Sequence, residues 1–155
     1  MARGDRLGRL PWLLPATYLV HGAEEYYLGF PAWLDDVAGA RLTPERFLEL
    51  NAFFFGVMVL AVLVATAIRP ARVILVPLAT VVVVNALLHL GGTIVTGRYS
   101  PGALTGLLLW LPLGLTLLTR LRREVPRLVL GLGMLAGLAL HALVTLAALG
   151  AGRGS

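Results

Sequence analysis

Apolar residues form five long runs along the chain, each bounded by arginine, proline or glycine. The runs cover approximately residues 10–33, 47–68, 73–96, 103–119 and 128–148. Each is near the roughly 20 residues that a tilted helix needs to cross about 30 Å of hydrocarbon. Stretches such as "VLAVLVATAI" are apolar at consecutive positions, whereas strands of a membrane barrel alternate. The pattern predicts an all-α, polytopic membrane protein, a single domain over residues 1–155 built as a bundle of five transmembrane helices.

Composition supports this class. Hydrophobic residues make up 58% of the 155 positions and charged residues only 14%, a balance that soluble domains of this size do not carry. The net charge of +5 does not indicate a nucleic-acid partner, because the basic residues are all arginine and cluster beside the apolar runs. The absence of cysteine excludes disulfides, thiolate catalysis and thiolate metal sites. The first run is read as a retained helix rather than a signal peptide, because "HGAEEYY" offers no small-x-small cleavage site.

The arginines predict an orientation. With five spans, one membrane face receives nine of them: Arg3, Arg6, Arg9, Arg69, Arg72, Arg120, Arg122, Arg123 and Arg127. The other face receives four: Arg41, Arg46, Arg98 and Arg153. Because positive residues favour the cytoplasmic side, we expect a bacterial inner-membrane protein with its N-terminus in the cytoplasm and its C-terminus outside.

Two further local signals concern helix starts and helix contacts. In "LTPER", Thr43 is expected to cap a helix whose first residue is Pro44. Small residues four positions apart let helices approach closely, either within the bundle or in a homo-oligomer. Two such Gly-xxx-Gly pairs occur: Gly102 with Gly106, and Gly133 with Gly137.

Polar side chains inside the predicted spans lie at a common depth. The three histidines of the chain, His21, His89 and His141, fall in the first, third and fifth runs, which cross in the same direction. At about 1.5 Å per residue, these histidines lie at depths that agree within about 10 Å, between the midplane and the outer leaflet. Glu24 and Glu25 are the only acids well inside a predicted span, since Glu49 lies near the end of its run, and they lie at the same level as the histidines. Such a convergence favours one polar centre.

Helical spacing supports that centre. Both Glu24 and Glu25 can share the face of His21, and Asn85 stacks beneath His89. An ionised side chain in hydrocarbon costs about 2.5–3.5 kcal/mol on insertion scales, so we expect these groups to face inward together. Two alternatives stay open: a span that ends near Val20, with the acids among headgroups, and histidines that only form interhelical hydrogen bonds.

Imidazoles and carboxylates are ligands of Zn²⁺ and of non-haem iron. We therefore expect a divalent transition metal, zinc first and iron second, and the candidate ligands are His21, Glu24, Glu25, His89 and His141. Adjacent glutamates point about 100° apart on a helix, so one would ligate and the other would act as general base. The candidate catalytic residues are Glu24, Glu25, Asn85 and Tyr99, with Asn85 orienting a ligand or donating to substrate.

Three motifs resemble a known family. "HGAEE" at 21–25, "NALLH" at 85–89 and "YSPGALT" at 99–105 are similar to the signature motifs of the HXXEE-domain family of small bacterial integral membrane proteins. The resemblance implies a multi-helix membrane protein in which these motif residues form a unit, and it implies no reaction. His141 lies outside the motifs, so its role rests on depth alone.

The function expected from these features is a membrane metal-dependent hydrolase that acts on a lipid or another hydrophobic molecule, with membrane lipids as its surroundings. An iron-dependent oxidoreductase with the same ligands is the first alternative. A proton-coupled transporter would need polar residues that continue to the cytoplasmic side, where the third and fifth runs offer only Thr80. A non-enzymatic binding or accessory protein is the remaining alternative.

Overall fold

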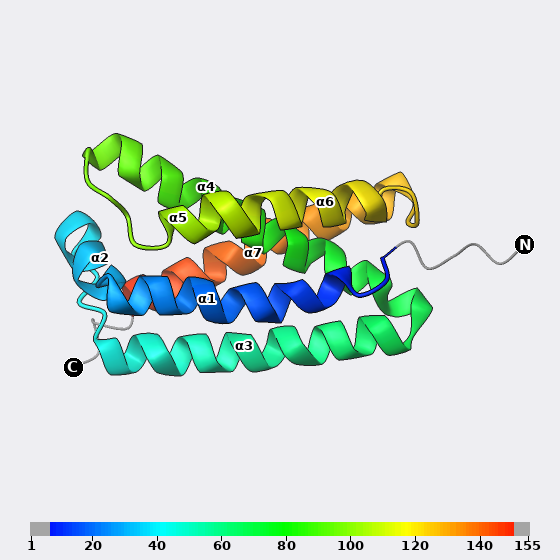
Figure 1. The fold of residues 1–155 in the computed structure, drawn as a ribbon, viewed down its shortest axis with the longest axis horizontal. Coiled ribbons are helices and arrows are strands. Elements are labelled where there is room, and N and C mark those ends of the chain that lie inside the picture. Colours follow the sequence, from blue (N-terminus) through cyan, green and yellow to red (C-terminus); the bar gives the residue numbers. More distant parts are fainter. Residues whose placement is uncertain (1–6, 151–155) are drawn as a thin grey trace, which may run out of the picture.

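The computed structural model describes residues 7–150, and this part of the chain folds into helices without any strand (Figure 1). The long helices are α1 (Leu13–Tyr27), α3 (Pro44–Ala67), α4 (Leu75–Thr96), α6 (Leu111–Leu121) and α7 (Arg127–Gly150). The shorter elements are η1 (Leu10–Trp12), α2 (Phe30–Ala38), η2 (Arg69–Ile74), α5 (Ala103–Thr105) and the π-helical turn η3 (Gly106–Trp110). The all-α prediction is confirmed.

Four helices within residues 7–150 are long and apolar enough to cross a membrane. They are Pro44–Ala67, Arg69–Thr96, Ala103–Leu121 and Arg127–Gly150, in which η2 continues into α4 and α5 continues through η3 into α6. Their bounds agree with the second to fifth predicted runs. The expected cap is also confirmed, because the Thr43 hydroxyl accepts a hydrogen bond from the Arg46 N–H at 3.2 Å.

The prediction of a fifth span over residues 10–33 is wrong. The helix is interrupted at Gly29, whose φ of 78° is a left-handed conformation that glycine adopts without a steric cost. This turn ends α1 after 15 residues and starts the separate helix α2. Fifteen residues extend about 22 Å, less than the hydrocarbon thickness, and two of them are the charged Glu24 and Glu25. Helix α1 continues past Val20 to Tyr27, and the alternative of a span that ends near Val20, with both acids among headgroups, stays a prediction.

The helices alternate in direction. Helices α1, α4 and α7 run one way and α3 and α6 run the other way (Figure 1). Helix α1 packs beside α3, to which the Tyr18 hydroxyl donates a 2.9 Å hydrogen bond at Asn51, and it also contacts η3. The alternation brings the end of α1, the end of α4 and the start of the helix at Ala103 to the same end of the bundle.

Helix α4 is the centre of the bundle and contacts α3, α6 and α7. Several of its apolar side chains are fully buried, including Leu75, Val76, Ala79, Val82 and Ala86. Glycines of the neighbouring helices let their backbones approach α4 closely. A Cβ atom on Gly137 would lie 2.7 Å from the Pro77 carbonyl oxygen, and one on Gly106 would lie 3.2 Å from the Ala86 Cα atom. The predicted Gly-xxx-Gly faces thus serve contacts inside this bundle.

The outside of the bundle is apolar. Leu60, Ile94, Val95 and Leu135 have between 62% and 86% of their surface exposed. Large apolar side chains that cover the outer surface of several helices indicate a membrane environment. Together with the four long apolar helices, this surface fits a membrane protein.

Candidate metal centre

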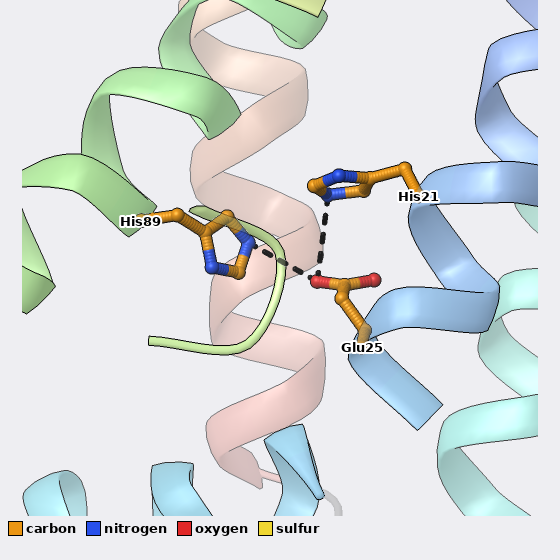
Figure 2. Close-up of side chains that lie close together, drawn as sticks. All are labelled: His21, Glu25 and His89. Carbon is orange, nitrogen blue, oxygen red and sulfur yellow. Dashed lines mark ion pairs between the residues drawn. The ribbon is translucent and has the colours of Figure 1, made fainter. Parts of the chain in front are cut away.

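Three buried side chains from α1 and α4 meet beside Gly102. His21 and Glu25 lie one turn apart on α1, so both project toward the same neighbour, and His89 reaches them from α4 (Figure 2). Oε1 of Glu25 lies 3.1 Å from Nε2 of His89 and 3.7 Å from Nε2 of His21. One ligand atom from each residue can be chosen so that all three lie within 4.8 Å of one another. The side chains are almost inaccessible, with exposed fractions of 1% for His21, 6% for Glu25 and 4% for His89.

In both imidazole rings, Nδ1 lies within hydrogen-bond distance of a hydroxyl group. Nδ1 of His21 lies 2.7 Å from the Thr105 hydroxyl, and Nδ1 of His89 lies 3.0 Å from the Ser100 hydroxyl. With Nδ1 engaged in this way, each ring is oriented with Nε2 toward Glu25. Nε2 of His21 is buried and has no hydrogen-bond partner among the residues that the structure describes. This nitrogen is therefore a buried polar atom that remains available to bind a ligand.

Gly102 lies directly against both imidazole rings. A Cβ atom at this position would be 2.8 Å from Cε1 of His89 and 3.0 Å from Cε1 of His21. Its φ of 101° is again one that glycine adopts without a steric cost. Helix α4 also holds this turn, because the Ser100 N–H donates to the Thr93 hydroxyl at 3.0 Å. A glycine here allows the 99–105 segment to pack against the two histidines.

Aromatic rings complete the walls around the histidines. Trp110, at the end of the π-helical turn, stacks on His21 with ring centroids 3.8 Å apart and an interplanar angle of 26°. Phe30, at the start of α2, places its ring centroid 5.1 Å from that of His89. Such walls keep the local dielectric low and strengthen electrostatic interactions between the three polar groups. Single π-helical turns occur frequently at functional sites.

Glu24 faces away from the histidine pair toward the 99–105 segment. Oε1 accepts hydrogen bonds from the Tyr99 hydroxyl, from the Gly102 N–H at 2.9 Å and from the Leu104 N–H at 3.2 Å, while Oε2 accepts from the Thr105 N–H at 2.8 Å. Burial raises the pKa of Glu24, but hydrogen bonds from Thr105, Tyr99 and Gly102 outweigh it and lower the pKa from 4.5 to about 2. Glu24 is thus a carboxylate whose two oxygens are already engaged.

The other predicted site residues lie around this group in different ways. His141 is buried on α7 and interacts electrostatically with His89 and Glu25, but its ligand atoms lie outside the group that converges within 4.8 Å. Its Nδ1 lies 3.3 Å from the Thr145 hydroxyl, and within the described chain its Nε2 has no hydrogen-bond partner. Oδ1 of Asn85 is buried and makes no hydrogen bond of good geometry among residues 7–150, and the Asn85 side chain interacts with the imidazole of His21. Tyr99 is about half exposed and donates to Glu24.

Some residues of the site were missed by sequence reasoning. An aromatic residue within an apolar run carries no signal for ring stacking, so the sequence does not assign Trp110 or Phe30 to the site. Ser100 and Thr105 were placed near the site without the role that the structure gives them, as hydroxyl partners of the histidines. Their position in "YSPGALT", next to a turn that returns toward the bundle, is the signal that could have assigned them.

The two imidazoles and the carboxylate could hold a metal ion. Two imidazoles and one carboxylate are found in catalytic zinc sites and in mononuclear iron sites, and both leave positions open for water or substrate. Hydroxyl partners on Nδ1 are the kind of outer contact that orients ligating histidines. Glu25 and the two imidazoles could hold such an ion without a cysteine.

Comparison with known proteins gives one match. Residues 12–117, well over half of the chain, match a protein family described as "Protein of unknown function with HXXEE motif". The matched range contains His21, Glu24, Glu25, His89 and the whole 99–105 segment, whereas His141 lies beyond it. No curated protein and no solved structure matches the chain.

Proposed function

Since the chain belongs to the family of proteins with the HXXEE motif, we propose that the motif builds a metal centre in a membrane protein. His21, Glu25 and His89 would hold the ion, and the reaction would be metal-dependent hydrolysis of a lipid or another hydrophobic molecule. The observation that carries the proposal is the convergence of two Nε2 atoms on one carboxylate oxygen, with both Nδ1 atoms held by hydroxyls.

A metal at this position supplies Lewis-acid activation of water at neutral pH. The chain contributes the rest. Glu25 and the two imidazoles fix the place of reaction, and Trp110 and Phe30 exclude bulk water from it. The Thr145 hydroxyl donates to the His141 carbonyl at 3.0 Å, so it can only accept from Nδ1–H of His141. Nε2 of His141 then carries a lone pair, and we assign it to accept the proton of water in place of Glu24, whose oxygens are engaged.

The proposed location is the outer half of the bacterial inner membrane. At the end of the bundle where α3 and α6 finish lie seven arginines: Arg9, Arg69, Arg72, Arg120, Arg122, Arg123 and Arg127. The opposite end, near the histidines, has three: Arg41, Arg46 and Arg98. The predicted Arg3, Arg6 and Arg153 lie outside the described residues. This distribution supports a cytoplasmic position for the arginine-rich end and an external position for the site end.

A second candidate function is an iron-dependent oxidoreductase. The observation that favours it is the ligand set itself, because two histidines and one carboxylate are also the ligands of non-haem iron oxygenases. These three ligands do not separate zinc from iron, so the identity of the bound metal decides between the two reactions.

Elemental analysis tests the metal centre. The full chain would be purified without chelators and without a polyhistidine tag, reloaded separately with Zn²⁺ and with Fe²⁺, and desalted. We expect about one equivalent of metal per chain in the wild type and loss of that equivalent in His89→Ala and Glu25→Gln. Thr80→Val is the matched control, since it removes a buried hydroxyl from α4 that bonds only to the Val76 carbonyl. A wild-type chain that retains no metal after reloading would refute the metal centre.

The reaction would be tested on the loaded protein in liposomes. For the zinc form, we expect release of fatty acid from a fluorogenic phospholipid ester, with loss in His89→Ala and retention in Thr80→Val. For the iron form, oxygen consumption in the same liposomes is the readout. Metal binding without either activity would leave the metal centre in place and reject both reactions on these lipids.

A further inference from the structure

The two adjacent glutamates of the motif have different partners. Glu25 faces the imidazoles, and Glu24 accepts four hydrogen bonds from the 99–105 segment. Two of the donors are the backbone N–H groups of Leu104 and Thr105, which are the second and third N–H groups of the helix that begins at Ala103. Within a helix, these N–H groups have no carbonyl partner, and a capping side chain normally accepts their hydrogen bonds.

The residue at the capping position cannot do this. That residue is Gly102, which has no side chain and makes no side-chain cap. Its contact with both imidazoles leaves no room for a Cβ atom, so a capping serine or aspartate would displace His21 and His89. Glu24 reaches over from α1 and accepts the hydrogen bonds that a capping residue would accept. Its negative charge also meets the positive end of the 103–121 helix dipole.

The segment that Glu24 holds is the one that orients the histidines. Between residues 99 and 105 it carries the Ser100 hydroxyl on Nδ1 of His89, the Thr105 hydroxyl on Nδ1 of His21, and Gly102 between the rings. The side chain of Thr105 also interacts with Glu24, so the hydroxyl that meets Nδ1 of His21 lies next to the Glu24 carboxylate. When this hydroxyl donates to the carboxylate, it accepts from Nδ1–H of His21 and leaves a lone pair on Nε2.

We infer that Glu24 is a positioning residue, which caps the 103–121 helix from α1 and, through Thr105, holds His21 in the tautomer whose Nε2 can bind a metal. This inference rests on the proposed metal centre for its consequence, but the tautomer itself does not require a metal. It explains why the motif contains two consecutive acids: one binds at the centre, and the other holds the segment that aims the ligands.

Zinc affinity separates a positioning residue from a ligand. The zinc affinity would be measured by competition with a chromophoric chelator in Glu24→Gln, Glu25→Gln and the wild type. Outer contacts of this kind are worth roughly 10–100-fold in affinity. We therefore expect Glu24→Gln to bind zinc about 10–100-fold more weakly, yet to reach one equivalent at saturating zinc. Glu25→Gln should fail to reach it.

A second pair of variants guards against loss of the fold. Thr105→Val removes the hydroxyl but leaves the backbone N–H groups on Glu24, and Thr105→Ser restores the hydroxyl. We expect Thr105→Val to weaken zinc binding as Glu24→Gln does, and Thr105→Ser to recover the wild-type affinity.

The tautomer has its own readout, which needs no metal. The chain contains three histidines, so ¹⁵N-histidine labelling of the zinc-free, untagged protein gives three pairs of ring nitrogens. In the wild type, the His21 pair should show a protonated Nδ1 and an unprotonated Nε2, and Thr105→Val should shift this pair while leaving that of His141 unchanged.

The outcomes are distinct. Wild-type affinity and ring shifts in Glu24→Gln and Thr105→Val would refute the positioning role. Complete loss of zinc in Glu24→Gln at saturating metal would identify Glu24 as a ligand instead. A wild type without zinc but with the expected tautomer would refute the proposed function and keep the inference.

Discussion

The backbone of Gly102 lies against the imidazole of His89 so closely that a Cβ atom would sit 2.8 Å from Cε1. This contact joins a turn near the end of the bundle to a buried histidine on its central helix. The turn therefore determines how the ring is oriented, and the ring in turn requires a glycine at that position.

Gly102→Ala should displace both histidines and lower metal affinity. The added methyl group meets two buried rings and also requires an unfavourable φ, which costs of order 1–3 kcal/mol. Zinc competition and thermal unfolding in detergent measure the two effects. Gly97→Ala is the matched control, because Gly97 has a φ of 64° but no atom within 4 Å of its Cβ position. Equal loss of zinc affinity in both variants would mean that the strain, and not the contact with the histidines, is responsible.

Ser100→Ala should weaken metal binding through His89 alone. The substitution removes the hydroxyl on Nδ1 and leaves a buried ring nitrogen without its partner, which costs about 1–3 kcal/mol. We expect zinc affinity to fall roughly 10–100-fold, measured by chelator competition. Thr66→Ala removes a hydroxyl that bonds only to carbonyls of its own helix, so it should leave zinc affinity unchanged. An unchanged affinity in Ser100→Ala would show that His89 is oriented without this hydrogen bond.

Much of this arrangement could be predicted from the sequence. Apolar runs predict four of the helices to within a few residues, because continuous apolarity over about 20 residues has few other solutions. The common level of His21, Glu25 and His89 predicts that they meet, because α1 and α4 run in the same direction and place these residues at the same level of the bundle. The i, i+4 spacing also predicts that His21 and Glu25 share a face.

Other features could not be predicted, because they depend on contacts between distant segments. The sequence cannot show that Gly29 ends α1, since a glycine within an apolar run is also compatible with a continuous helix. Nor does the spacing of adjacent glutamates decide which one faces the histidines. That choice depends on where the 99–105 segment lies, and the segment is 75 residues or more from Glu24 along the chain.

Two glycines of α7 should respond in opposite directions to alanine. At Gly137, a methyl group would lie 2.7 Å from the Pro77 carbonyl oxygen and 2.6 Å from the Thr80 Cβ atom, so Gly137→Ala should separate α7 from α4 and lower the thermal unfolding temperature. At Gly131, no atom lies within 4 Å. Gly131→Ala should therefore gain about 0.8–1.0 kcal/mol of helix propensity and raise the thermal unfolding temperature. The same direction of change in both variants would contradict the packing of α7 on α4.

Reporter fusions should place the two ends of the bundle on opposite sides of the membrane. The turn between α6 and α7 contains the exposed Arg122 and Arg123, and the arginine-rich end is expected in the cytoplasm. Helix α7 runs from this turn to the end near the histidines (Figure 1). In a bacterial host, a periplasm-active phosphatase fused after the C-terminus should thus be active, and the same enzyme inserted between Arg122 and Arg123 should be inactive. A cytoplasm-active reporter at the same two sites provides the reciprocal control. Phosphatase activity at the turn, with none at the C-terminus, would invert the orientation and place the histidine site in the cytoplasmic half of the bilayer.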